Sequence, residues 1–275
     1  FGGPSGFTIS RIDDATYADS GKALRMHRTN GNSQTNNHGF GQGIETLNSL
    51  RLAGQSVILS FKAKRGADFS GSGNTINCSI NAGEGTDENP FGMTNTNSSS
   101  QSFTLLETDT SHTLTFDIPS DKTQVTVLFN YTPTGTAGVN DWFEIADCQL
   151  EMGTEATPFE YVSHGDELAR CYRYCYVISD GAIGMGAQKA SDQIIGHIQF
   201  PATMRATPTA TTDSLVLRID SGLHLESSSS GTFTLSEAGP RSTGYKMTGF
   251  SGGLANGSGF FVKENSGSIT LSAEL

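Results

Sequence analysis

Short stretches in which apolar and polar residues alternate constrain this chain more than any other feature. In residues 55–64, Val57, Leu59 and Phe61 fall on one face of an extended strand, while the residues between them fall on the other. Residues 124–131 show the same period of two. Both stretches predict strands that bury one side against a core.

Further stretches of this kind predict strands at residues 7–12, 23–28, 75–82, 102–106, 112–118 and 142–150. Between them, residues 30–43 and 87–101 are rich in Asn, Ser and Gly and are predicted to be polar loops. No helix longer than two turns is expected. Eight or nine short strands at this spacing indicate an all-β sandwich, for which a jelly roll is a common arrangement.

Residues 143–176 are predicted to join two β modules. A strand ends there, and Gly153 and Pro158 mark a turn. Ser163 followed by Asp166 predicts a capping box that opens a short helix over residues 166–172, and a new strand is expected at 174–178. We therefore expect an N-terminal module over residues 1–163 and a C-terminal module over residues 164–275.

The junction carries the pattern QLE-x-G-x-x-x-TPFE followed by E-L-x-x-C-x-R-Y, which resembles a junction found in many bacteriophage tail-fibre and tail-appendage proteins. The residues that carry it are Gln149, Leu150, Glu151, Gly153, Thr157, Pro158, Phe159, Glu160, Glu167, Leu168, Cys171, Arg173 and Tyr174. The resemblance implies a jelly roll similar to carbohydrate-binding modules, a C-terminal receptor-binding β tip and a homotrimer. Because the chain starts at Phe1 without Met, we expect an N-terminally truncated jelly roll.

The C-terminal module is predicted to contain strands at residues 194–200, 214–219, 232–235, 245–250, 259–262 and 268–272. The segments GAIGMG, ESSSSG and FSGGLANGSG between them are predicted turns. Residues 200–209 and 271–275 are similar to stretches in the tips of the same phage proteins. We find neither an internal repeat nor a heptad pattern, so β surfaces are expected to hold any trimer.

The charge of the chain limits its partners. A formal net charge of −11 argues against nucleic acid and against anionic membranes, and no apolar run approaches the ~20 residues of a membrane span. The four cysteines are expected to be free, mostly buried thiols, with no bound metal or other cofactor.

Catalytic patterns are weak. Residues 249–253 fit G-x-S-x-G, but the Gly, Asn and Ser that follow cannot form the helix such a nucleophile requires. The six histidines show no metal-ligand spacing, and the acidic pairs lie in predicted loops. Asp147, on the strand that closes the jelly roll, is a candidate calcium ligand by resemblance alone, without a calcium-loop motif beside it. We expect no enzymatic activity.

Sugar sites use aromatic rings that stack on pyranose faces, surrounded by polar hydrogen-bonding groups. Trp142 and Tyr131 flank the predicted loop 132–141, and Phe40 and Phe91 fall in the polar loops. These four residues are the candidate carbohydrate-binding residues, and each could instead pack on the core or line a subunit contact.

The expected function is that of a phage virion adhesin, assembled in the bacterial cytoplasm alongside other tail proteins. Its loops would attach to a bacterial surface polysaccharide or an outer-membrane protein. Two alternatives remain open: a structural spacer or baseplate part, and a carbohydrate-binding accessory of a depolymerase.

Overall fold

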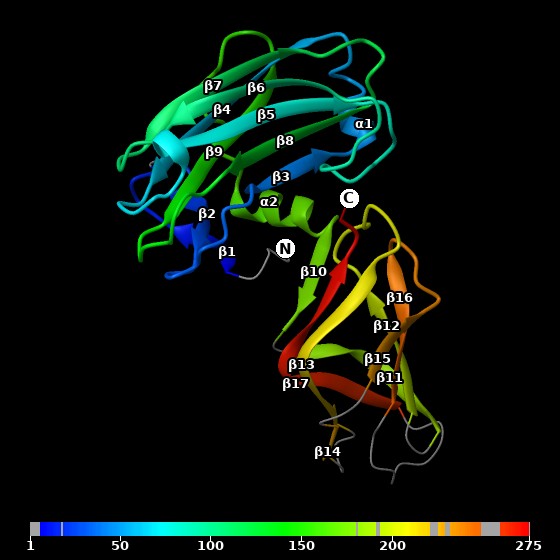
Figure 1. Cartoon of the computed structure of the whole chain (residues 1–275). Helices are drawn as coiled ribbons and strands as arrows, with labels where there is room; N and C mark the ends of the chain where they lie inside the picture. Colours follow the sequence, from blue (N-terminus) through cyan, green and yellow to red (C-terminus); the bar gives the residue numbers. More distant parts are fainter. Residues whose placement is uncertain are drawn as a thin grey trace. The chain divides into compact units, whose positions relative to one another are not determined.

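The computed structural model describes residues 6–17, 19–179, 181–190, 193–220, 225–228, 232–248 and 259–274. The chain forms two compact units, Phe1–Tyr161 and Val162–Glu274, each built almost entirely from antiparallel strands (Figure 1).

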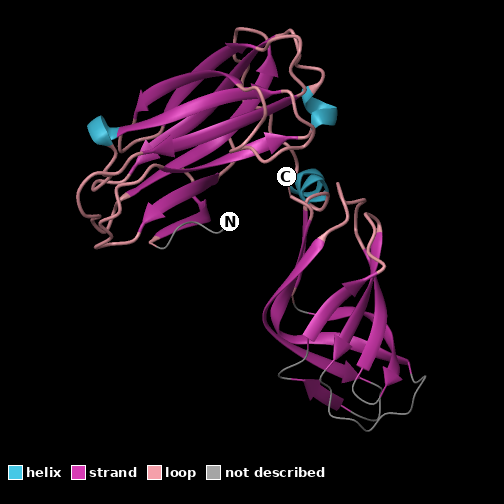
Figure 2. Cartoon of the chain, turned by 45° about the vertical axis from the view of Figure 1, so that its right-hand side comes forward, coloured by secondary structure: helices cyan, strands magenta, loops and turns pink. Residues whose placement is uncertain are grey.

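The first unit is a sandwich of two sheets. The five-stranded sheet has the order β1 (Phe7–Asp13), β2 (Lys22–Arg28), β9 (Trp142–Met152), β4 (Ser56–Arg65) and β7 (Thr110–Asp117). The four-stranded sheet has the order β3 (His38–Ile44), β8 (Gln124–Tyr131), β5 (Thr75–Gly83) and β6 (Asn97–Thr104). Figure 2 shows the strands of this unit as two layers. The all-β fold class predicted from the sequence is confirmed.

The core of the first unit lies between the two sheets. Val57, Leu59 and Phe61 on β4 are buried there, as the alternation predicted, and they meet Val125 and Phe129 on β8. Burial of these apolar faces is the main stabilising contribution to a sandwich of this kind.

Two strands lie where loops were predicted. In β3, the outward positions are Gly39, Gly41 and Gly43, so the strand lacks the polar alternation that marks a half-buried strand. Glycine is required at the centre, because a Cβ on Gly41 would lie 2.6 Å from the Val127 carbonyl oxygen and would collide with the Leu128 side chain. The sequence predicted only the end of β6, because the strand begins with Asn and a run of serines that is typical of a loop.

Helices are few and short. α1 (Thr46–Ser49) and the 3-10 turn η1 (Ser72–Asn74) have no clear sequence signal. In the second unit, α2 (His164–Cys171) begins two residues before the predicted start at 166, and Ser163 is its N-cap as the capping box predicted: its hydroxyl accepts from the backbone N–H of Asp166 at 3.3 Å.

Residues of the junction pattern hold one another by hydrogen bonds within the first unit. The Gln149 side chain accepts from the Glu160 N–H at 2.7 Å and donates to the Thr157 hydroxyl at 3.1 Å. The Glu151 carboxylate accepts from the Thr157 N–H at 3.1 Å and from its hydroxyl at 2.5 Å. Two side chains of β9 thus hold the segment that follows the strand.

The second unit is a single sheet. Its strand order is β14 (Leu225–Ser228), β13 (Thr209–Asp220), β17 (Gly259–Ser272), β11 (Gly181–Ala190), β12 (Gln193–Gln199), β16 (Ser242–Thr248) and β15 (Thr232–Ser236), and β10 (Cys175–Ile178) also pairs with β17. Its core includes Ile194, Ile198, Tyr245, Ile269 and Leu271.

Some turns predicted in this unit are wrong. GAIGMG lies in β11, and ESSSSG begins inside β14. The glycine-rich segment 250–259 lies almost wholly outside the described residues.

The four cysteines are free, as predicted. Their expected burial is wrong, because Cys148 and Cys171 are exposed and Cys78 is the buried thiol.

Candidate functional site

Two of the four predicted sugar-contacting rings belong to the core. Phe40 and Tyr131 are 7% and 2% exposed and project between the sheets. Phe40 stacks on Phe143 with ring centroids 5.7 Å apart, and Tyr131 packs against Phe69 at 5.1 Å. These rings therefore have no free face for a sugar, because the alternation of their strands points them inward.

Trp142 is half-buried on the outward side of the five-stranded sheet. The Arg25 guanidinium lies 4.1 Å from its ring centroid, and Gly66 packs so closely that an added Cβ would lie 2.7 Å from the indole nitrogen. A cation–π contact thus occupies one face of the ring, and the close approach of Gly66 restricts access to its edge.

Ion pairs surround Trp142, and we call the outward side of the five-stranded sheet, with Arg25, Lys62, Lys64, Trp142 and Glu144, the ion-paired face. Glu144 is fully buried, pairs with Arg25 and accepts from the Tyr17 hydroxyl at 3.2 Å. Lys64 contacts Glu144 at 3.5 Å and also binds Asp14.

The loop between β1 and β2 covers part of this face. Tyr17 packs on Ala23 and Ala146, and burial together with Glu144 raises the pKa of its hydroxyl. The hydrogen bond from Lys64 lowers the pKa of Asp14 to about 2. These groups are hydrogen-bonded or ion-paired with one another, which leaves few donors and acceptors for a ligand.

Asp147, the candidate calcium ligand, has a cationic partner instead. It lies at a β-bulge with φ of 49°, and its carboxylate is 3.1 Å from the Lys62 ammonium, which also contacts Asp19 at 2.6 Å. Among the described residues, no group of three or more His, Cys, Asp or Glu could hold a metal ion.

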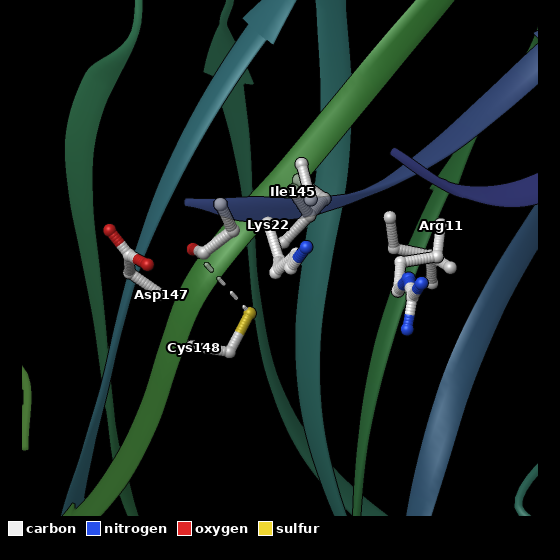
Figure 3. Close-up of a pocket in the computed structure, with 8 residues that line it drawn as sticks. Arg11, Lys22, Ile145, Asp147 and Cys148 are labelled. Atoms are coloured by element: carbon white, nitrogen blue, oxygen red, sulfur yellow. Dashed lines mark hydrogen bonds between the residues drawn. The ribbon is translucent and has the colours of Figure 1, made fainter. Parts of the chain in front are cut away.

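A shallow hollow lies beside this bulge. It measures about 260 Å³ and is lined by Arg11, Lys22, Ala23, Leu24, Ile145, Ala146, Asp147 and Cys148. Figure 3 shows Asp147 and Cys148 on one side, Arg11 on the other, and Ile145 and Lys22 between them. Two of its charged groups have partners of opposite charge, since Lys22 is paired with Asp13 at 2.5 Å and Asp147 with Lys62 at 3.1 Å.

The outward side of the four-stranded sheet has a different chemistry, and we call it the polar face. Strand register arranges it in three rows: Gly39–Asn130–Asn77–Ser102, Gly41–Leu128–Ser79–Ser100 and Gly43–Thr126–Asn81–Ser98. None of these described residues carries a charge. Each row runs from a glycine on β3 to a serine on β6, across two strands that bear amides and hydroxyls.

Hydrogen bonds within the polar face engage part of its capacity. Asn81 donates to Ser79 and Thr126 at 3.3 and 3.4 Å, and Asn37 donates to Asn130 at 3.3 Å. Each asparagine side chain has two N–H donors and a carbonyl with two lone pairs, so donors and acceptors remain for a polar ligand.

Phe91 is the exposed member of the predicted aromatic set, with 67% of its surface accessible. Its loop folds over one end of the polar face, where the side-chain amide of Gln124 bonds to the backbone of Glu88. The structure therefore brings Phe91 to the rim of the polar face and leaves Trp142 on the opposite sheet.

The asparagines of the polar face were missed in the sequence, although a signal was present. Asn77, Ser79 and Asn81 alternate with core residues along β5. The signal is this run of small amides and hydroxyls on one side of a strand, which contains no aromatic ring.

Comparison with known proteins yields likenesses of structure alone. No family model matches the sequence. No curated protein matches it either. Among solved structures, the enzymatically active domain of tailspike protein 4 of bacteriophage CBA120 has 14% identity and a TM-score of 0.39, over 55% of this chain and 18% of that one.

Carbohydrate-binding modules are also similar in fold. A family 16 module has 15% identity and a TM-score of 0.35 over 54% of this chain and 89% of that one. The second CBM22 xylan-binding domain of Xyn10C from Paenibacillus barcinonensis has 16% identity and a TM-score of 0.36 over 55% and 90%. These likenesses concern the β-sandwich and assign no ligand.

Proposed function

We propose that this chain is a virion attachment protein, the distal part of a phage tail fibre or related appendage, which binds a bacterial surface glycan through the polar face. The observation that carries the glycan assignment is the array of three uncharged rows, in which the polar side chains are all amides and hydroxyls. Sugar hydroxyls are both donors and acceptors, and they pair with such groups without the desolvation cost of burying a charge.

The virion assignment is supported by the junction sequence rather than by the site. The same resemblance implies a homotrimer. Three copies would present three polar faces to a repetitive surface, and linked weak contacts raise apparent affinity by orders of magnitude. Other tail proteins would be its partners within the particle, and an outer-membrane protein is the second candidate receptor.

We infer binding without a built-in reaction. The acidic residues grouped on and around the ion-paired face, Asp14, Glu144 and Asp147, are each held by a lysine or arginine. Glycoside hydrolysis needs two carboxylates on either side of a sugar cleft, one of them available as an acid.

Among the described residues, no helix is long and apolar enough to span a membrane.

The test uses the full chain on an array of purified bacterial lipopolysaccharides and capsular polysaccharides, and on whole cells. Replacing both amides of the first row, Asn77→Ala with Asn130→Ala, is expected to lower binding at least tenfold. Thr113→Ala, an exposed change on the opposite sheet, is the matched control and is expected to bind like the wild type. Equal binding by all three proteins would contradict the use of the polar face.

The same experiment separates the alternatives. A wild-type chain that binds neither array nor cells would favour a structural spacer or baseplate part. Release of reducing ends from a bound polysaccharide would contradict the inference of binding without reaction.

A further inference from the structure

The loop of residues 84–96, which carries Phe91, is held in one shape by its own hydrogen bonds. The Gln124 side chain accepts from the Glu88 N–H and donates to the Glu88 carbonyl, both at 2.7 Å. The Glu88 carboxylate accepts from the N–H and the hydroxyl of Thr94, both at 2.7 Å, and these bonds lower its pKa. Phe91 therefore projects from a braced backbone.

This loop lies on the polar face. Gly83 and Gln124 are paired outward positions one row beyond the third. Glu88 is bonded to Gln124, and Met93 covers Gly83 so closely that an added Cβ would lie 2.8 Å from the Met93 Cβ. Phe91 comes between these two anchors in the chain and is exposed, so the loop closes one end of the polar face and presents a ring there.

The polar face thus combines two kinds of surface. Its amides and hydroxyls match sugar hydroxyls, whereas Leu128 in the second row and Phe91 at the closed end are apolar. Pyranoses have the same combination, with hydroxyls at the ring edge and C–H groups on the ring face, and aromatic rings offer C–H groups a large flat partner. Three rows and the closing loop extend about 20 Å along the strands, which is room for several sugar units.

We propose that Phe91 forms a stacking subsite at the Gln124 end of the polar face, for a pyranose ring that presents an unsubstituted C–H face. This subsite rests on the proposed function, since it places one more sugar unit on the same surface. Phe91 acts as a specificity-determining contact, because a sugar with a bulky or axial substituent on that face cannot lie flat on the ring.

Leu47 provides a matched control. It is 69% exposed on α1, and the preceding residue, Thr46, exchanges hydrogen bonds of 2.8 and 3.0 Å with Asp87 of the same loop. Leu47→Ala therefore removes an exposed apolar side chain of similar accessibility from a neighbouring element without touching the polar face rows.

The experiment compares the full chain with Phe91→Ala, Phe91→Trp and Leu47→Ala on the array of lipopolysaccharides and capsular polysaccharides, after thermal melting has shown that each variant folds. Phe91→Ala is expected to weaken binding about tenfold, Phe91→Trp to retain or improve it, and Leu47→Ala to leave it unchanged. Among bound polysaccharides, those with an open pyranose face are expected to lose most.

The outcomes distinguish the two proposals. If the paired Asn77 and Asn130 substitutions abolish binding while Phe91→Ala binds like the wild type, the stacking subsite is overturned and the proposed function stands. An equal loss in Leu47→Ala would also overturn it, because the contact would then be a general apolar one. A wild type that binds no polysaccharide on the array overturns the proposed function and the subsite with it.

Discussion

The two outer faces of the first unit are built from strands of the same alternating pattern, yet they use their polar side chains in opposite ways. On the ion-paired face, Glu144 is satisfied by Arg25, Lys64 and Tyr17, and a loop packs over it. On the polar face, the side chains are uncharged; the β6 serines are exposed and the asparagines half-buried, whereas Ser79 and Thr126 are buried. A charged face that pairs with itself stabilises the fold, whereas an uncharged face with spare donors and acceptors is available to a ligand.

The difference also concerns size. Long side chains on the ion-paired face reach partners that are distant in the sequence. The hydrogen bond between the Tyr17 hydroxyl and the Glu144 carboxylate is an example. The polar face has mainly glycine, serine and asparagine, and these short side chains leave the β6 edge of the face exposed. Side-chain length thus decides which surface remains accessible.

The largest expected effect is on the ion-paired face. Glu144→Ala leaves the partly buried Arg25 and Lys64 without their shared carboxylate, and removing one partner of a buried ion pair is strongly destabilising. We expect a loss of about 3 kcal/mol in the free energy of unfolding, measured by urea denaturation. A loss below about 1 kcal/mol would show that the network contributes little.

Close packing within the polar face is the next test. Gly41→Ala would place a Cβ 2.6 Å from the Val127 carbonyl oxygen, and overpacking of this kind costs about 2 kcal/mol. Gly92→Ala is the control, since a Cβ there meets nothing within 4 Å. Equal stability of the two variants, measured by urea denaturation, would mean that β3 can move away from β8.

The pH dependence distinguishes the faces through Asp14. Its pKa is lowered from 3.8 to about 2 in the folded chain, so its stabilising contribution is full above about pH 4 and is lost as the pH falls towards 2. The contribution amounts to about 2 kcal/mol at neutral pH. Asp14→Asn is expected to remove this part of the acid-induced loss, measured by unfolding at pH 6, 4, 3 and 2; parallel pH profiles for variant and wild type would contradict it.

The smallest expected effect on stability is on the polar face itself. Asn77→Ala changes a half-buried side chain outside the core, and such substitutions usually stay within about 0.5 kcal/mol. Thermal melting of this variant should therefore match the wild type. A large loss would mean that the rows have a structural purpose, and would weaken their assignment as a binding surface.

Much of the fold follows from the sequence alone. The alternation of Val57, Leu59 and Phe61 predicted both β4 and its buried side, and the pattern at Ser163 predicted the residue that caps α2. These signals are local, because burial of one side of a strand or the capping of one turn depends on residues a few positions apart.

Tertiary structure decided which candidate residues are accessible. Phe40 and Phe91 both lay in predicted loops, but β3 pairs with β8 and turns the first inward, whereas Gln124 holds the loop that exposes the second. Asp147 likewise forms an ion pair with Lys62. The hydropathy of a residue indicates whether its side chain prefers water. The residues that contact that side chain come from distant strands, and their identity is decided only when the sheets assemble.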